Sequence, residues 1–125
     1  MKVLIDTSVW IDHLKNNNKL ANKALTDEKD DILVHTMIIC ELMLGGIKRD
    51  SELMVLFESQ DKAVEASIEE VIAFVENNSV FGRGVGYVDC CLLASCILSD
   101  AAILTLDRKL EELARELGIE VYEQL

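Results

Sequence analysis

The chain alternates short apolar runs with longer segments in which apolar residues recur at helical spacing. Each run has the length and composition of a buried strand, and the runs lie at residues 2–6, 31–35, 102–106 and 119–122, with a weaker one near 63–66. The helical pattern begins near residue 7 and returns at 20–28, 36–44, around 53–57, from 67 to 75, at 88–98 and at 108–117. Strands that alternate with helices indicate parallel βαβ units, so we expect an α/β sandwich.

Capping residues mark the ends of several of these helices. Ser67 with Glu70 three residues later forms a capping-box pattern, and the pair Gly45–Gly46 ends the helix that Thr36 is expected to cap. These signals place the turns between the predicted elements.

Length and composition indicate one domain that spans residues 1–125. Half of the residues are apolar and there is no proline, so the chain can bury a sizeable core without a visible linker. The stretch 85–99, in which Asp89 is the single charge, is too short to span a bilayer, so we expect no membrane contact. Four cysteines lack a spaced pair and favour core packing in a reduced, cytoplasmic protein.

The chain is strongly acidic, with 23 acidic and 12 basic residues and a formal charge of −11. Such a charge opposes non-specific binding of polyphosphates. A nucleic-acid function therefore requires bound metal ions, local basic residues or a basic partner.

Four acids stand in segments that are otherwise uncharged. Asp6 follows the first strand, Glu41 lies within the apolar helix at 36–44, Asp89 opens the apolar helix at 88–98, and Asp107 follows the strand at 102–106. Burying a carboxylate costs roughly several kcal/mol unless a cation or hydrogen-bond donors offset the loss of hydration. No Lys or Arg lies inside these segments, so the pattern predicts an external cation.

Parallel topology brings the four acids together. Sites in open parallel sheets form beyond the carboxyl ends of the strands, where Asp6 and Asp107 are expected. Oxygen ligands without His or Cys at ligand spacing favour Mg²⁺, or Mn²⁺, over Zn²⁺. Such a centre suits phosphodiester hydrolysis, because the metal activates water and neutralises charge on the phosphate.

Four sequence segments resemble, in order, the motifs of PIN-domain proteins and in particular the VapC toxins of type II toxin–antitoxin pairs. They are Asp6-Thr-Ser-Val-Trp-Ile-Asp-His-Leu, Cys40-Glu-Leu-Met-Leu-Gly, Gly82-Arg-Gly-Val-Gly-Tyr-Val-Asp-Cys-Cys-Leu-Leu-Ala-Ser and Leu104-Thr-Leu-Asp-Arg-Lys-Leu. The resemblance implies a three-layer α/β/α sandwich with a five-stranded parallel sheet. It also implies a catalytic and metal-binding quartet of Asp6, Glu41, Asp89 and Asp107, in which Asp6 and Asp89 are the most direct ligands.

The resemblance carries further expectations about the site and its partners. Ser8 and Thr105 match positions where the family often has a hydroxyl or amide that lines the site. Relatives usually form homodimers and are inhibited by a VapB antitoxin, whose tail often places an Arg or Lys in the acidic pocket. The RNA substrate stays open between tRNA, rRNA and mRNA. The chain departs from the family pattern at His35-Thr-Met-Ile and Cys90-Cys91, which puts pocket shape and partner choice in question.

Each assignment has a plainer alternative. The three aspartates can act as helix N-caps, and Glu41 can lie on an exposed helix face. Arg83 can contact RNA phosphate, stabilise a dimer or be an ordinary surface residue, and Arg108 and Lys109 can contact the RNA backbone. The apolar stripe at 53–57 is either core or part of a groove for an antitoxin helix.

The leading hypothesis is a metal-dependent endoribonuclease that acts as a toxin. The first alternative is a non-catalytic PIN module that uses the same acids only to bind a basic antitoxin tail. A receiver-type signalling domain is disfavoured, because it needs paired acids after the first strand and a lysine after a late strand. A haloacid-type phosphatase needs Asp-x-Asp where this chain has Asp6-Thr-Ser.

Overall fold

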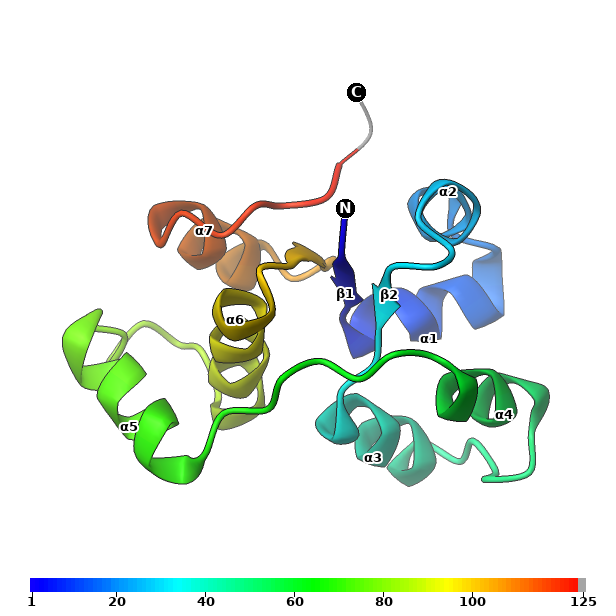
Figure 1. The fold of residues 1–125 in the computed structure, drawn as a ribbon, viewed down its shortest axis with the longest axis horizontal. Coiled ribbons are helices and arrows are strands. Elements are labelled where there is room, and N and C mark those ends of the chain that lie inside the picture. Colours follow the sequence, from blue (N-terminus) through cyan, green and yellow to red (C-terminus); the bar gives the residue numbers. More distant parts are fainter. Residues whose placement is uncertain (124–125) are drawn as a thin grey trace.

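The computed structural model describes residues 1–123 as alternating strands and helices (Figure 1). In chain order the elements are β1 (Val3–Ile5), α1 (Thr7–Asn16), α2 (Lys19–Asp27), β2 (Ile32–Leu33), α3 (Thr36–Leu44), α4 (Glu52–Ser59), α5 (Ile68–Asn77), α6 (Tyr87–Ser99), β3 (Ala102–Leu104) and α7 (Arg108–Glu116). The predicted α/β class and the order of its elements are therefore confirmed.

The sheet is parallel, with the strand order β2-β1-β3. In the part of the chain that the structure describes it has three strands rather than the expected five. Val3 pairs with Ile32 on one side and with Ala102 on the other. The outer two strands are reduced to single bridges, Val34 with Lys62 and Ile103 with Val121, which lie at the two edges of the sheet. The runs near 63–66 and 119–122 thus lie beside the sheet, but each pairs at one residue only.

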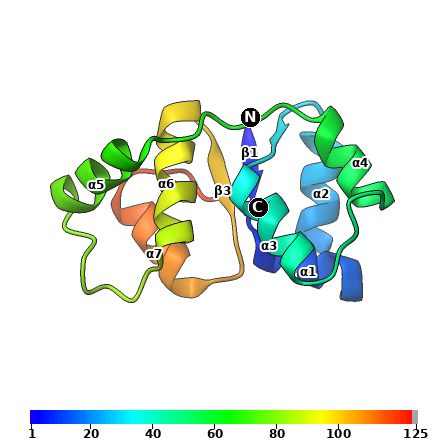
Figure 2. The same ribbon diagram turned by 90° about the horizontal axis from the view of Figure 1, so that it is seen from below.

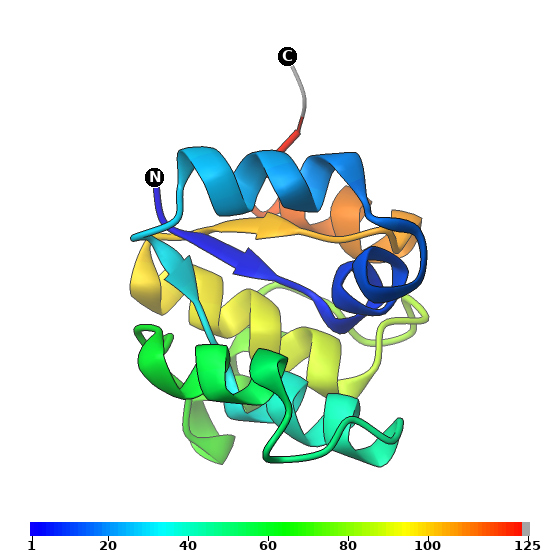
Figure 3. The same cartoon turned by 90° about the vertical axis from the view of Figure 1, so that its right-hand side faces the viewer.

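Helices cover both faces of the sheet. Figures 1 and 3 show α2 and α7 on one side and the helices α3 to α6 on the other. Figure 2 shows the carboxyl ends of β1 and β3 and the first turns of α1, α6 and α7 along the same side of the molecule. This edge is where the sequence places Asp6, Asp89 and Asp107.

The core lies where the three strands meet α6 and α7. All strand residues are buried, and so are Leu92 and Leu93 of α6 and Leu110 and Leu113 of α7. The near-continuous apolar character of α6 agrees with this central position, because a helix that is apolar all round is a buried one.

Helix boundaries follow the predicted signals with one correction. Ser67 and Glu70 form the expected capping box at the start of α5, and α3 ends at Gly45. Thr36, however, is the first residue of α3 and not its cap, because the ring of His35 accepts the hydrogen bond from Met37 N at 3.0 Å. The Thr36 hydroxyl instead donates to Glu65.

Two apolar expectations are only partly met. Phe57 of the 53–57 stripe is buried against Trp10, with ring centroids 4.8 Å apart, but Leu56 is exposed. Cys90, Cys91 and Cys96 are buried as expected, whereas Cys40 is exposed on α3. Among residues 1–123, no helix combines the length and the apolar character required to cross a bilayer.

The central strand provides a test of the core. Leu4 is fully buried in β1, whereas Leu44 at the end of α3 is 88% exposed. We expect Leu4→Ala to lower the free energy of unfolding by about 2–5 kcal/mol, because it leaves a cavity. Leu44→Ala is expected to change it by about 0.5 kcal/mol at most. Urea denaturation followed by circular dichroism measures both, and equal effects would contradict this account of the core.

Candidate active site

Asp6 leaves β1 and is held by three hydrogen-bond donors. Its Oδ1 accepts from Thr7 N at 2.7 Å, and its Oδ2 accepts from Ser8 Oγ at 2.9 Å and from Thr105 Oγ1 at 2.8 Å. The carboxylate is buried and also forms the N-cap of α1. Capping alone does not account for this set, because the contact with Thr105 reaches across to the segment that follows β3.

Ser8 and Thr105 connect the two strand ends. Ser8 Oγ accepts from Leu106 N at 3.2 Å while it donates to Asp6, and Thr105 Oγ1 accepts from Asp107 N at 3.0 Å while it donates to the same carboxylate oxygen. Each hydroxyl therefore both donates and accepts a hydrogen bond, which fixes its orientation. The structure brings these two sequence-selected residues directly to Asp6.

Glu41 reaches the same region from α3. Its Oε1 accepts a hydrogen bond of 2.7 Å from the hydroxyl of Thr7, the residue next to Asp6. The sequence alone does not indicate Thr7 as a site residue, because a threonine after an aspartate at a helix start is an ordinary capping arrangement. Its position next to Asp6 was the only signal available.

Asp89 lies half-buried in the first turn of α6. Burial is the main cause that raises the pKa of its carboxyl above the usual range, and the charge of Asp6 raises it next. The charges of Asp107 and Glu41 also raise this pKa, whereas a hydrogen bond from the backbone of Gly86 lowers it. Asp89 therefore experiences the negative charge of all three other acids.

Asp107 has a structural role as well as a place in this cluster. It is the N-cap of α7, and its Oδ1 accepts from Lys109 N at 2.9 Å and Leu110 N at 3.3 Å. Its side chain is exposed. Among residues 1–123 no hydrogen bond involves Oδ2, so the capping role leaves one oxygen available.

The cluster contains oxygen donors and no protein cation. None of the ion pairs within residues 1–123 includes Asp6, Glu41, Asp89 or Asp107. The same residues also contain no group of three or more acidic, His or Cys side chains at metal-ligand spacing. The four acids are thus close enough to affect one another electrostatically without being closed around an ion. Mg²⁺ in proteins usually keeps several waters and takes only one or two protein carboxylates.

Arg83 is not among the residues brought together. It lies in the exposed loop between α5 and α6, and its guanidinium donates to both carboxylate oxygens of Glu116 on α7, at 2.9 and 2.8 Å. The contact ties this loop to α7.

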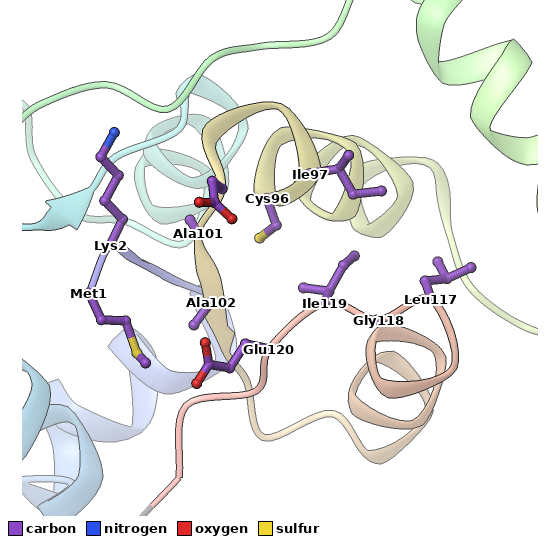
Figure 4. Close-up of a pocket in the computed structure, with 11 residues that line it drawn as sticks. Met1, Lys2, Cys96, Ile97, Ala101, Ala102, Leu117, Gly118, Ile119 and Glu120 are labelled. Carbon is purple, nitrogen blue, oxygen red and sulfur yellow. The ribbon is translucent and has the colours of Figure 1, made fainter.

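Two hollows bear on the location of the site. A pocket of about 540 Å³ lies at the amino ends of the strands, lined by Lys2, Ala102 and Ile119 among others, and contains none of the four acids (Figure 4). A second pocket of about 330 Å³ lies between α1 and α3. Its lining combines the apolar residues Ile11, Leu14, Leu42 and Ile47 with Gly45 and with the charged residues Glu41 and Lys15.

Comparison with known proteins gives consistent matches over nearly the whole chain. A sequence model of the PIN domain matches residues 3–116. The chain is 32% identical over 124 residues to a protein named Ribonuclease VapC32 of Mycobacterium tuberculosis, and the match covers 98% of each chain.

Solved structures share the fold at low sequence identity. A toxin–antitoxin complex from Klebsiella pneumoniae matches with a TM-score of 0.71 and 18% identity over 99% of this chain and 100% of that chain. FitAcB from Neisseria gonorrhoeae matches with a TM-score of 0.70 and 16% identity, covering 97% and 96% of the two chains. DNA-bound VapBC from Salmonella typhimurium gives a TM-score of 0.69 and 14% identity at the same coverage.

The raised pKa of Asp89 generates a prediction about stability. A carboxyl that is harder to ionise in the folded than in the unfolded state loses its stabilising contribution as the pH rises through its folded-state pKa. In EDTA at pH 7, Asp89→Asn should therefore melt at a higher temperature than the wild type, and the difference should shrink below about pH 4. Mn²⁺ should reverse the order, since an ion at a hundredfold excess over its Kd stabilises the wild type by about 2.7 kcal/mol.

Glu69→Gln is a suitable control, because Glu69 is an exposed acid in the first turn of α5. It reports the loss of a favourable helix-dipole interaction and should not raise the melting temperature. Two results would contradict the proposed repulsion of Asp89 by the other acids. One is an Asp89→Asn variant that melts below the wild type in EDTA, and the other is a variant whose melting temperature rises as much in Mn²⁺ as that of the wild type.

Proposed function

The chain belongs to the PIN domain family, and on that premise we propose that it is a VapC-type ribonuclease, the toxin of a toxin–antitoxin pair. The observation that carries the proposal is the convergence of Asp6, Glu41, Asp89 and Asp107, expressed in the effect of the other three on the pKa of Asp89. A carboxyl whose pKa is raised by three neighbouring acids, with no protein cation beside it, is ionised at a cost that a divalent ion would relieve.

We infer that the ion is Mg²⁺ or Mn²⁺, held by Asp6 and Asp89 with Glu41 and Asp107 completing the site. The donor set supports this choice, because it contains only oxygen atoms. When bound, the ion supplies an activated water and neutralises charge on the scissile phosphate of RNA.

The chain's own residues orient the acids for this role. Ser8 and Thr105 donate to the same oxygen of Asp6, which fixes the plane of its carboxylate. The hydroxyl of Thr7 does the same for Glu41. Supporting hydrogen bonds of this kind hold metal ligands in a productive geometry, so these hydroxyls position the catalytic groups.

We propose that a basic antitoxin of the VapB type occupies the hollow between α1 and α3. Its lining is largely apolar and carries Glu41 and Lys15 as its charged members, so it suits an apolar helix followed by an Arg or Lys that reaches Glu41. A net charge of −11 favours association with a basic partner. We further propose that the toxin is a homodimer, as the resemblance implies.

The acids themselves provide the first test of the activity. Asp6→Asn and Asp89→Asn should each reduce cleavage of RNA in Mg²⁺ or Mn²⁺ below detection and abolish growth inhibition, because each removes a metal ligand. Circular dichroism should show that both variants remain folded. Asp30→Asn, which alters an exposed acid in the turn before β2, should keep full activity.

Full activity in either site variant would contradict the assignment. A wild-type protein that is inert toward RNA in both metals, yet binds its antitoxin tightly, would favour the non-catalytic module instead.

Thr105 tests the supporting hydrogen bonds. Thr105→Val keeps the shape but removes the donor to Asp6 and the acceptor for Asp107 N. We expect activity or metal affinity to fall about 10–100-fold. Thr105→Ser retains the hydroxyl and should recover most of the loss. The measurement is cleavage rate against Mn²⁺ concentration, and an unchanged half-saturating concentration and rate would show that the hydroxyl has no positioning role.

A further inference from the structure

Neither helix capping nor an ion pair accounts for the position of the Lys109 side chain. Its backbone N–H donates to the carboxylate of Asp107, but its side chain runs across Gly84 in the loop between α5 and α6. A Cβ added at Gly84 would lie 3.0 Å from Lys109 Nζ, 3.7 Å from Cδ and 3.8 Å from Cε. The ammonium group therefore rests on backbone that only a glycine leaves uncovered.

The charge of Lys109 is unfavourable where it stands. It lies in the first turn of α7, where the helix macrodipole disfavours a cation. Four of the 12 basic side chains form ion pairs within residues 1–123, and Lys109 is among the others. Its ammonium is therefore available to an anion from outside the protein.

The two elements that hold Lys109 also supply two of the acids. The loop of Gly84 leads directly into α6 and Asp89, and α7 begins immediately after Asp107. Figure 2 shows the first turns of these two helices on the same side of the molecule. The ammonium thus lies at the junction between the segments that carry Asp89 and Asp107, beside a cluster that is otherwise negative.

We propose that Lys109 binds a backbone phosphate of the RNA next to the one that is cleaved, and that Gly84 is required because it leaves room for the ammonium. This inference rests on the proposed ribonuclease function. An acidic protein must attract a polyanion locally, and a cation at the rim of the site meets that need. Arg83 does not serve the same purpose, because its guanidinium is already paired with both carboxylate oxygens of Glu116.

The first arm of the test measures RNA binding apart from chemistry. The probe is a fluorescein-labelled 12-nucleotide single-stranded RNA, with Ca²⁺ in place of Mg²⁺ and fluorescence anisotropy as the readout. Lys109→Met should weaken binding by on the order of tenfold and reduce the slope of log affinity against log salt by about 0.7, the value for one phosphate of a single strand. Lys109→Arg should keep most of the affinity.

Lys29→Met is the matched control. Lys29 is an exposed lysine in the turn before β2. It lies at the amino ends of the strands, whereas the four acids lie at the carboxyl ends. Its removal lowers the net charge by the same amount, but affinity and salt slope should stay close to the wild type.

Two glycines separate phosphate binding from loop strain. Gly82 and Gly84 both have φ +75°, but an added Cβ meets nothing within 4 Å at Gly82 and meets Lys109 at Gly84. Gly84→Ala and Gly82→Ala should therefore destabilise the loop alike, whereas only Gly84→Ala should also weaken RNA binding as Lys109→Met does.

The outcomes distinguish this inference from the function on which it rests. If Lys109→Met matches the wild type in affinity and salt slope, or if the wild type does not bind the RNA, the role of Lys109 is overturned. If the two glycine variants weaken RNA binding equally, Gly84 is not specifically required to make room for the ammonium group of Lys109. A wild type that binds the probe through Lys109 but cleaves no RNA in Mn²⁺ would overturn the ribonuclease function and leave the phosphate contact intact.

Discussion

Repulsion among four carboxylates at one edge of a parallel sheet is the constraint on which the site depends. Two such charges about 5 Å apart repel by about 3 kcal/mol at an effective dielectric near 20, and each further acid adds to that cost. The protein offsets part of it with hydroxyl and backbone donors, three of them on Asp6 alone. It offers no Lys or Arg within ion-pair distance of the four acids in the described residues, and we propose that a divalent ion relieves the remaining cost.

Parallel topology is what creates that constraint. Because β1 and β3 are neighbours and run in the same direction, Asp6 and the segment of Thr105 and Asp107 leave the sheet side by side. The central position of β1 places it within reach of α3, from which Glu41 bonds to Thr7. The fold thus concentrates residues that are up to 101 positions apart in the sequence, as the difference between Asp6 and Asp107 shows.

Much of this arrangement could be predicted from the sequence, because strand ends and uncharged surroundings are local signals. Asp6 and Asp107 follow apolar runs, and Glu41 and Asp89 are isolated charges in apolar helices. The contacts that depend on tertiary geometry were not predictable. They include the bond from Thr7 to Glu41 and the pairing of Arg83 with Glu116. The capping of α3 by His35 is local, but histidine is not among the residues that usually cap a helix, so Thr36 was the expected cap. The outer strands were predicted too long, because apolar runs near 63–66 and 119–122 do not reveal that each pairs at only one residue.

We propose that these acids surround a divalent-ion site, and anomalous diffraction from crystals soaked in Mn²⁺ is the most direct test. We expect a manganese peak about 2 Å from a carboxylate oxygen of Asp6 and of Asp89, with Glu41 and Asp107 facing it directly or through water. A peak bound elsewhere, or side chains of the four acids turned away from one another, would contradict it.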